Sequence, residues 1–250
     1  MAGKRGTRGR LGAVFPAPGA AGHNRFQLTP VYLERSCAPP VEFAASANTK
    51  LRFAYAVERS LACIALIGLS PVLFVVAIAT AALSRSGPFV RHARVGWQGR
   101  PLKMLKFRTM WAPGGRAGCF QMVEDVYGPP LHCKQESDAR INSRFAIFCR
   151  RFSIDELPQL VHVVCGEMSL VGPRPITREE LDEYYADCTE EVLSLRPGIT
   201  GLWQVMGRNE LTYAARRRLD RFFVRRASFS LYARILLRSL PCVISGRGAY

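Results

Sequence analysis

The uncharged stretch LACIALIGLSPVLFVVAIATAAL, residues 61–83, decides the fold. At about 1.5 Å per residue it is long enough to cross the roughly 30 Å hydrocarbon core of a bilayer. Its middle contains Ser70 and Pro71. The proline leaves the carbonyl of Ile67 without its helical hydrogen bond, so the Ser70 hydroxyl or a local distortion must satisfy that carbonyl. The stretch therefore predicts a membrane helix that is broken at Ser70-Pro71.

Basic residues lie on both sides of this stretch. Lys50, Arg52 and Arg59 precede it, and Arg85 is the first of several that follow. Because positively charged flanks favour the cytoplasmic side, both ends are expected there, which a re-entrant hairpin satisfies and a straight span does not. A proline-kinked single span is the alternative.

The composition narrows the class of partner. The chain has 250 residues, 48% of them hydrophobic, and a net charge of +16 that is concentrated in residues 1–60 and 206–250. Such a balance suits nucleic acid, anionic lipid or a phosphorylated substrate. The apolar stretch favours membrane lipid, so no nucleic-acid partner is expected. The eight cysteines include no Cys-x-x-Cys pair, which argues against a zinc site and fits reduced thiols.

A short β-hairpin is expected after the membrane stretch. Residues 89–95 and 102–110 have the pattern of two strands around the turn at 96–99. Strand alternation places Lys106 and Arg108 on one face, where two neighbouring cations could hold a diphosphate. A solvated face is the commoner alternative for such a pair.

The stretch RRFSIDELPQL, residues 150–160, is the candidate active site. Pro158 cannot donate a helical hydrogen bond, so a helix is expected to begin near it, with Asp155 and Glu156 just ahead of its N-terminus. Negative charge is favoured there, and the same position could receive phosphate. The alternative is a structural capping box from Ser153 to Glu156, which would place Pro158 inside the helix.

Arginines around the two carboxylates suggest the reaction class. Arg150 and Arg151 precede them, Arg174 follows in residues 166–175, and all three guanidiniums could clamp a phosphate bidentately. A carboxylate among phosphate-binding arginines favours phosphoryl transfer. Arg196 lies in the turn-rich loop 196–204 and is a weaker candidate for binding.

The C-terminal half alternates acidic and basic helical segments. Residues 177–194 are acidic, begin with a capping box from Thr177 to Glu180, and are expected to present a solvated face. Residues 211–226 form a basic amphipathic helix expected on an anionic membrane surface. Its basic face comprises Arg216, Arg217, Arg218, Arg221, Arg225 and Arg226. Residues 230–243 continue with an apolar helical pattern suited to core or interface packing.

Together these motifs resemble one family. The sequence contains LKFRTM at 105–110, SDARI at 137–141, RRFSIDELPQL at 150–160, GEMSLVGPRP at 166–175, RPGITGLWQV at 196–205 and GRGAY at 246–250. In this order they are similar to the bacterial sugar transferases, the monotopic phosphoglycosyl transferases, over about residues 55–250. The chain departs from the family pattern at His162, where an Asn is usual, and at Tyr232, where an aspartate is usual.

The resemblance implies a fold and a location. It implies a mainly α fold with a small β-hairpin, held on the membrane by a re-entrant helix broken at Ser70-Pro71 and by amphipathic interfacial helices. Residues 1–50 mix Gly, Ala, Pro and Arg without apolar periodicity and are expected to be a disordered basic leader. With the resemblance, residues 51–86 are expected to be the re-entrant helix-break-helix and residues 87–250 a cytoplasmic catalytic domain that ends in the interfacial helices. The expected location is the bacterial inner membrane, with the catalytic domain on its cytoplasmic face.

The resemblance also implies an activity. Family members transfer a sugar phosphate from a nucleotide diphosphosugar, usually a UDP-sugar, to polyprenyl (undecaprenyl) phosphate and release a nucleoside monophosphate, here UMP. This step initiates exopolysaccharide, capsule, O-antigen or glycoconjugate assembly. The family's nucleophile falls on Asp155, which would form a phosphosugar-aspartyl intermediate, and its glutamate, associated with the required Mg²⁺, falls on Glu156. The residues assigned to phosphate or nucleotide binding are Lys106, Arg108, Arg150, Arg174 and Arg196.

Two functions of other classes compete with this interpretation. A non-catalytic membrane scaffold could keep the fold, and a basic nucleic-acid-binding protein could explain the net charge of +16. Retention of Asp155 and Glu156 argues against the first, and the apolar stretch argues against the second. The sequence leaves open the sugar, the pathway, the length of the lipid and the oligomeric state, a homodimer included.

Overall fold

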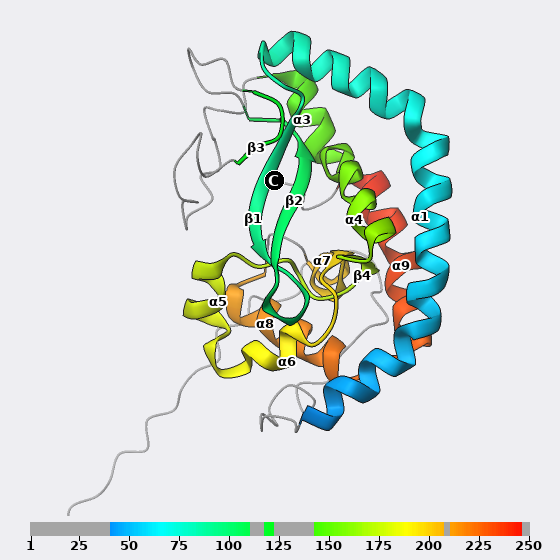
Figure 1. Ribbon diagram of the computed structural model, residues 1–250, viewed down its shortest axis with the longest axis vertical. Helices are drawn as coiled ribbons and strands as arrows, with labels where there is room; N and C mark the ends of the chain where they lie inside the picture. Colours follow the sequence, from blue (N-terminus) through cyan, green and yellow to red (C-terminus); the bar gives the residue numbers. More distant parts are fainter. Residues whose placement is uncertain (1–40, 111–117, 123–142, 208–210, 247–250) are drawn as a thin grey trace, which may run out of the picture. The chain divides into compact units, whose positions relative to one another are not determined.

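The computed structural model describes residues 41–110, 118–122, 143–207 and 211–246, with side chains from residue 49 onward (Figure 1). The predicted leader up to residue 40, most of the glycine- and proline-rich stretch 111–139, the SDARI motif and residues 247–250 lie outside the described residues. Over the described ranges the chain is mostly helical with two small sheets, as the sequence predicts.

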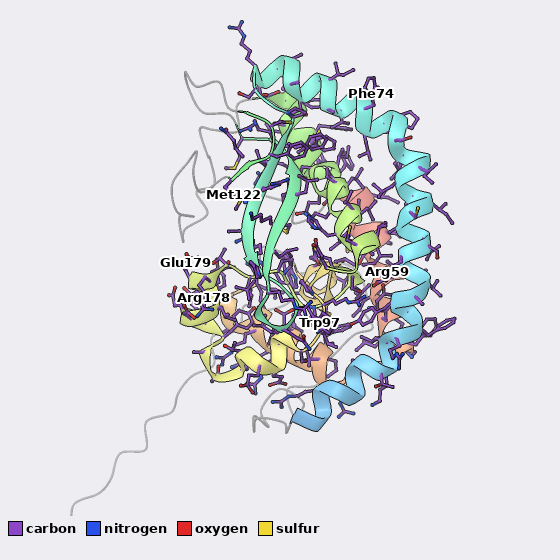
Figure 2. The ribbon with its side chains drawn as sticks, viewed as in Figure 1. Arg59, Phe74, Trp97, Met122, Arg178 and Glu179 are labelled. Carbon is purple, nitrogen blue, oxygen red and sulfur yellow. The ribbon has the colours of Figure 1, made fainter. Side chains whose placement is uncertain are left out.

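Helix α1 runs from Val41 to Ser84 and contains the predicted membrane stretch. It begins before the predicted boundary at residue 50 and continues through Pro71 as one helix. The Ser70 hydroxyl donates a hydrogen bond of 2.7 Å to the Ile67 carbonyl, as expected for the acceptor that the proline leaves free. The ribbon changes direction between the part that carries Arg59 and the part that carries Phe74 (Figures 1 and 2).

One face of α1 is apolar and exposed. It carries Ile64, Ile67, Phe74, Val75 and Ile78, each more than half exposed. The part Thr49–Ser84 is long and apolar enough to cross a membrane by length and composition alone. Such a surface is larger than a water-soluble chain usually leaves uncovered, which is consistent with membrane association.

The predicted β-hairpin is present. Strands β1, Phe89–Val95, and β2, Pro101–Phe107, pair antiparallel with Phe89 opposite Phe107. They are joined by the 3₁₀ turn η2, Trp97–Gly99. The short strand β3, Gln121–Met122, adds to β1 in parallel, so the strand order is β2-β1-β3 and β2 is an edge of this sheet.

The predicted active-site stretch follows helix α3, Arg144–Arg151. Ser153 has a left-handed backbone, with φ of 55°, and turns the chain into the 3₁₀ helix η3, Ile154–Gln159, and then into α4, Leu160–Cys165. Ser153 makes no side-chain cap, so the alternative of a capping box with Glu156 is wrong. Both carboxylates precede α4, as the sequence predicts, but the 3₁₀ helix η3 that holds them in its first turn was not predicted. Pro158 is accommodated by the 3₁₀ geometry of this turn.

A second, two-stranded sheet lies beyond α4. Strand β4, Ser169–Val171, pairs in parallel with β5, Gly198–Thr200. The backbones of Gly172 and Gly198 approach so closely that a Cβ atom on Gly198 would lie 2.1 Å from the Gly172 nitrogen. Between the strands lie α5, Arg178–Tyr184, the 3₁₀ turn η4, Ala186–Cys188, and α6, Thr189–Leu193. The predicted capping box of Thr177 and Glu180 opens α5.

The chain continues through α7, Leu202–Met206, α8, Tyr213–Arg225, and α9, Phe229–Ser245. The sequence predicted that the acidic residues of 177–194 face solvent and that the basic residues of 211–226 face a membrane. Both predictions are wrong in part, because several of these acidic and basic side chains pair with each other. Arg221 and Arg225 both contact Glu191 of α6, whose side chain is only 6% exposed. Arg217 contacts Asp187, and Arg216 is buried. Of the six predicted arginines only Arg218 on α8 and Arg226, which directly follows α8, are exposed.

Helix α9 retains the character expected of an interfacial helix. Leu231 and Ile235 are buried, whereas Leu237, Leu240 and Ile244 are each more than half exposed. It packs beside α1, where Tyr232 donates a hydrogen bond to the buried Glu58 carboxylate. The exposed apolar surfaces of the chain therefore belong largely to α1 and α9.

Candidate active site

Asp155 and Glu156 lie where η3 packs against the edge strand β2. Asp155 is 7% exposed. Ile154, directly before it, packs with Phe107 of β2 and with Cys149 of α3, which fixes the start of η3. The carboxylate is therefore held by a well-packed turn rather than by a free loop.

Lys106 is the cation that contacts this pair. Its Nζ atom lies 2.7 Å from Oε1 of Glu156 and donates a hydrogen bond to it. Both side chains are only partly exposed, at 20% for Lys106 and 29% for Glu156. Charge-assisted bonds of this kind are shorter and stronger than neutral ones. The geometry places the Lys106 cation beside the two carboxylates, and its assignment to phosphate binding stays a prediction.

Arg108 does not share that position. It is 2% exposed, its Nε donates to the Gly87 carbonyl at 2.8 Å, and its Nη2 donates to the Gly118 carbonyl at 2.9 Å. Strand β2 ends at Phe107, so the alternation that was expected to pair Arg108 with Lys106 no longer applies. The guanidinium holds two chain segments together at the end of the hairpin, which the sequence did not indicate.

Burial and the surrounding charges set the protonation of Asp155. Burial raises its pKa from 3.8 to about 6, and Glu156 contributes to the rise, whereas the nearby cations Lys106 and Arg150 lower it. A carboxyl with a pKa near 6 is mostly ionised at pH 7. Asp155 can therefore act as a nucleophile at neutral pH, and its attachment to a buried turn limits its hydration.

The predicted arginines divide into two groups. Arg150 is an electrostatic neighbour of Asp155, and its buried Nε atom has no hydrogen-bond partner among the described residues. Arg174 instead contacts Glu180, with 3.3 Å between Nη2 and Oε1, and lies over the ring of Trp203. The structure thus brings Lys106 and Arg150 to Asp155, while Arg174 contacts Glu180 and Trp203 instead.

Arg196 occupies a third location. Its guanidinium carbon lies 4.7 Å from the ring centre of Tyr55 on α1 and 5.4 Å from that of Trp97. Trp97 stands at the tip of the hairpin (Figure 2) and donates a hydrogen bond to the Ser194 carbonyl. Arg196 therefore connects α1 with the hairpin through cation–π contacts.

His92 is a residue near the site that the sequence reasoning missed. Burial, together with the nearby Lys106, Arg94 and Arg150, lowers its pKa to about 2, so the imidazole is neutral. On β1 it shares a face with Arg94, and Met104, two residues before Lys106, lies opposite it in the sheet. His92 and Arg94 alternate along a predicted strand that pairs with the strand of Lys106. This pattern is the signal that could have identified His92 as a residue near the site.

The two carboxylates are the candidate ligands for a metal ion. In the described part of the chain no group of three or more His, Cys, Asp or Glu side chains is arranged to hold a metal. Mg²⁺ is commonly bound by one or two carboxylates together with substrate phosphates and water, rather than by an all-protein cage. Asp155 and Glu156, next to each other in η3, fit that requirement.

The whole described domain matches one known family. Residues 49–246 match the bacterial sugar transferases. The chain belongs to the bacterial sugar transferase family. This confirms the resemblance on which the sequence prediction of an enzyme rests.

Curated relatives agree with this assignment. An exopolysaccharide production protein, ExoY, of Sinorhizobium fredii is 39% identical over 194 residues, which cover 76% of this chain and 84% of the relative. A UDP-glucose:undecaprenyl-phosphate glucose-1-phosphate transferase of Xanthomonas campestris pv. campestris is 35% identical over 201 residues, 77% of this chain and 39% of the relative. An undecaprenyl-phosphate galactose phosphotransferase of Salmonella typhimurium is 37% identical over 164 residues, 64% of this chain and 34% of the relative. This sugar transferase therefore corresponds to most of the first relative and to about a third of each of the other two.

Proposed function

We propose that this sugar transferase moves a sugar-1-phosphate from a UDP-sugar to polyprenyl phosphate and releases UMP. The observation that carries the proposal is Asp155, a buried carboxylate whose charged neighbours are Lys106, Glu156 and Arg150. A carboxylate with a pKa of about 6 beside two cations can approach a diphosphate and attack phosphorus, because the cations offset the negative charge of the substrate. The names of the relatives, which include undecaprenyl-phosphate sugar phosphotransferases, support the same substrates.

The proposed reaction has two steps. In the first, an Asp155 oxygen attacks the phosphorus that bears the sugar, the bond from that phosphorus to the bridging oxygen breaks, and UMP leaves with the electron pair. A phosphosugar-aspartyl anhydride remains on the enzyme. In the second, an oxygen of polyprenyl phosphate attacks the same phosphorus and breaks its bond to Asp155. Polyprenyl diphosphosugar is formed and the carboxylate is restored, so atoms and charge balance without an external acid or base.

The surrounding side chains have distinct parts in this scheme. Arg150 presents a guanidinium with a buried Nε free of described partners, which suits an incoming phosphate. Lys106 holds Glu156 and keeps positive charge beside Asp155. Glu156, with Asp155, would hold Mg²⁺, which when bound supplies additional positive charge to the diphosphate.

The experiment is a two-part assay of UMP release from a panel of UDP-sugars in the presence of Mg²⁺. With polyprenyl phosphate, turnover is expected for at least one sugar. Without acceptor, a burst of up to one UMP per enzyme is expected, together with a phosphosugar attached to the protein. Asp155→Asn should abolish both the burst and the turnover, whereas Asp182→Asn, an exposed carboxylate on α5, should retain them. Turnover in Asp155→Asn, or a strict need for acceptor before UMP appears, would contradict the covalent scheme.

We further propose that α1 enters the cytoplasmic leaflet of the bacterial inner membrane and returns to the same side at Ser70-Pro71. Basic residues on both flanks, the exposed apolar face and the change of direction before Phe74 support this arrangement. It would keep Asp155 on the side where UDP-sugars occur and next to the phosphate of a lipid-borne acceptor.

Cysteine accessibility tests this topology in a background without native thiols. Single probes at Thr49→Cys and Ser86→Cys should both react only from the cytoplasmic side. Replacing Ser70 and Pro71 by Ala and Leu restores the helical donor and should make one probe reactive from outside. Labelling from opposite sides in the parent protein would show an ordinary single span instead.

A further inference from the structure

His162 connects the two elements on which the active site is built. It lies in α4, which continues directly from η3 with Asp155 and Glu156. Its Nε2 atom accepts a hydrogen bond of 3.1 Å from the backbone N–H of Leu105 in β2. Its Nδ1 atom lies 2.5 Å from Oε2 of Glu167. The ring thus bridges the strand that carries Lys106 and the helical unit that carries Glu156.

These contacts define one protonation form of the ring. A backbone N–H can only donate, so Nε2 must be the unprotonated, accepting nitrogen. Nδ1 then carries the hydrogen and donates it to the Glu167 carboxylate, the usual way in which a second partner selects a tautomer. The backbone carbonyl of His162 accepts from the N–H groups of Glu167 and Met168, at 2.8 and 3.1 Å, which holds Glu167 next to the ring.

The position of Leu105 gives this bond its importance. Among the described strands β2 is at the edge of its sheet, so the N–H groups on its outer side face no strand of that part of the chain. A side chain that accepts from Leu105 satisfies one of these groups and fixes the distance between β2 and α4. The next residue, Lys106, uses its Nζ atom to contact Glu156 at 2.7 Å. The two bonds, from consecutive residues of β2, therefore join the strand to η3 and α4 at two points.

We propose that His162 is a positioning residue for the transfer reaction, which acts by fixing β2 so that Lys106 meets Glu156. The expected kinetic effects rest on the proposed function, whereas the role of His162 in holding β2 against α4 does not depend on it. A purely space-filling role would be met by any apolar side chain of similar size. The positioning role requires an acceptor at the place of Nε2.

Two variants separate these roles. His162→Gln keeps a neutral side chain whose Oε1 can accept from the Leu105 N–H, whereas His162→Leu offers no acceptor. Loss of a hydrogen bond to a partly buried N–H corresponds to about a tenfold change in an equilibrium or a rate. We expect His162→Leu to lower kcat about tenfold with a KM for the UDP-sugar within about threefold of the parent, and to need more Mg²⁺ for half-maximal rate. His162→Gln should restore kcat to within about threefold.

Hydrogen exchange of the Leu105 amide provides a readout that is independent of activity. Exchange should be about tenfold faster in His162→Leu than in the parent and close to parental in His162→Gln. Equal exchange and equal kcat in all three proteins would overturn the proposal, as would an impaired His162→Gln in which the Leu105 amide remains protected. If His162→Leu fails to fold, His162→Gln decides alone: parental kcat and protection support the role, and their loss refutes it. If the parent releases no UMP from any UDP-sugar, the proposed function is wrong. The exchange data still test the hydrogen bond between the Leu105 amide and His162.

Discussion

Replacing Lys106 by Met removes the cation in contact with Glu156 while keeping a long side chain in the hairpin. The contact is 2.7 Å long, and the two side chains are 20% and 29% exposed. Hydrogen bonds to charged groups contribute about 1.5–3 kcal/mol. Because both side chains are partly exposed to solvent, we take about 2 kcal/mol, below the upper end of that range, for this contact. If the contact persists in the transition state, its loss lowers kcat/KM by about 30-fold.

Lys106→Met should also alter the pH dependence. Lys106 lowers the pKa of Asp155, whereas burial and the Glu156 charge raise it. Removal of Lys106 should therefore move the pKa of Asp155 above about 6. With this higher pKa a smaller fraction of Asp155 is ionised at pH 7, and the ionised fraction increases as the pH rises through the new pKa. Part of the lost rate should therefore return between pH 7 and pH 8.5.

The assay is the initial rate of UMP release with saturating acceptor, and Lys103→Met is the matched control. Lys103 lies on the same strand with an exposed side chain, so this variant loses the same charge away from Glu156. We expect the control to stay within about threefold of the parent at every pH. A Lys106→Met enzyme that also stays within threefold, or one whose rate loss is the same from pH 7 to pH 8.5, would refute the assignment of Lys106.

Further predictions concern buried charges near the site. Burial raises the pKa of Asp220 from 3.8 to about 7, so about 4 kcal/mol of stability that is present at low pH is lost as the pH rises from about 4 to about 7. Asp220→Asn keeps a neutral partner for the Tyr185 hydroxyl and should flatten the fall in Tm between pH 4 and pH 7. Glu191→Gln should lower the free energy of unfolding by about 1.5–3 kcal/mol in denaturant titrations, because it removes the buried carboxylate that accepts from Arg221 and Arg225 while Arg221 keeps Asp187 at 3.7 Å, and a loss below 1 kcal/mol would contradict the buried pair. Since the pKa of His92 is lowered to about 2, the ring does not titrate between pH 5 and pH 9, and His92→Gln should leave the pH optimum of UMP release unchanged.

The features that the sequence predicted correctly are those with a local cause. Pro71 and Ser70 lie next to each other, and the hydrogen bond from Ser70 to Ile67 follows from helix geometry alone. The capping box of Thr177 and Glu180 likewise depends on a spacing of three residues. The hairpin follows from two alternating segments around a glycine turn.

The features that the sequence missed depend on contacts between distant segments. The acidic segment of α6 and the basic helix α8 are each amphipathic by pattern, and pattern alone assigns the charged face of each to solvent. Their opposite signs allow Glu191 to be buried between Arg221 and Arg225. The opposite charges of the two helical segments were a signal of pairing between them. The periodicity within one helix, however, does not show what its polar face contacts. The burial of Arg108 has the same kind of cause, because its acceptors, the carbonyls of Gly87 and Gly118, lie outside the predicted strand 102–110.

The bend in α1 has a consequence for the active site as well as for the membrane. Before Pro71, α1 packs through Ala62 and Leu66 against Leu160 and Val163 of α4. After Pro71, it packs through Leu73 and Val76 in the cluster that contains Ile154, the residue before Asp155. The two contacts lie at opposite ends of the η3–α4 unit, so the direction of α1 on each side of Pro71 determines how this unit is held. A change at Ser70-Pro71 that straightens α1 should therefore disturb Asp155 through Ile154, whether or not it changes how α1 associates with a membrane.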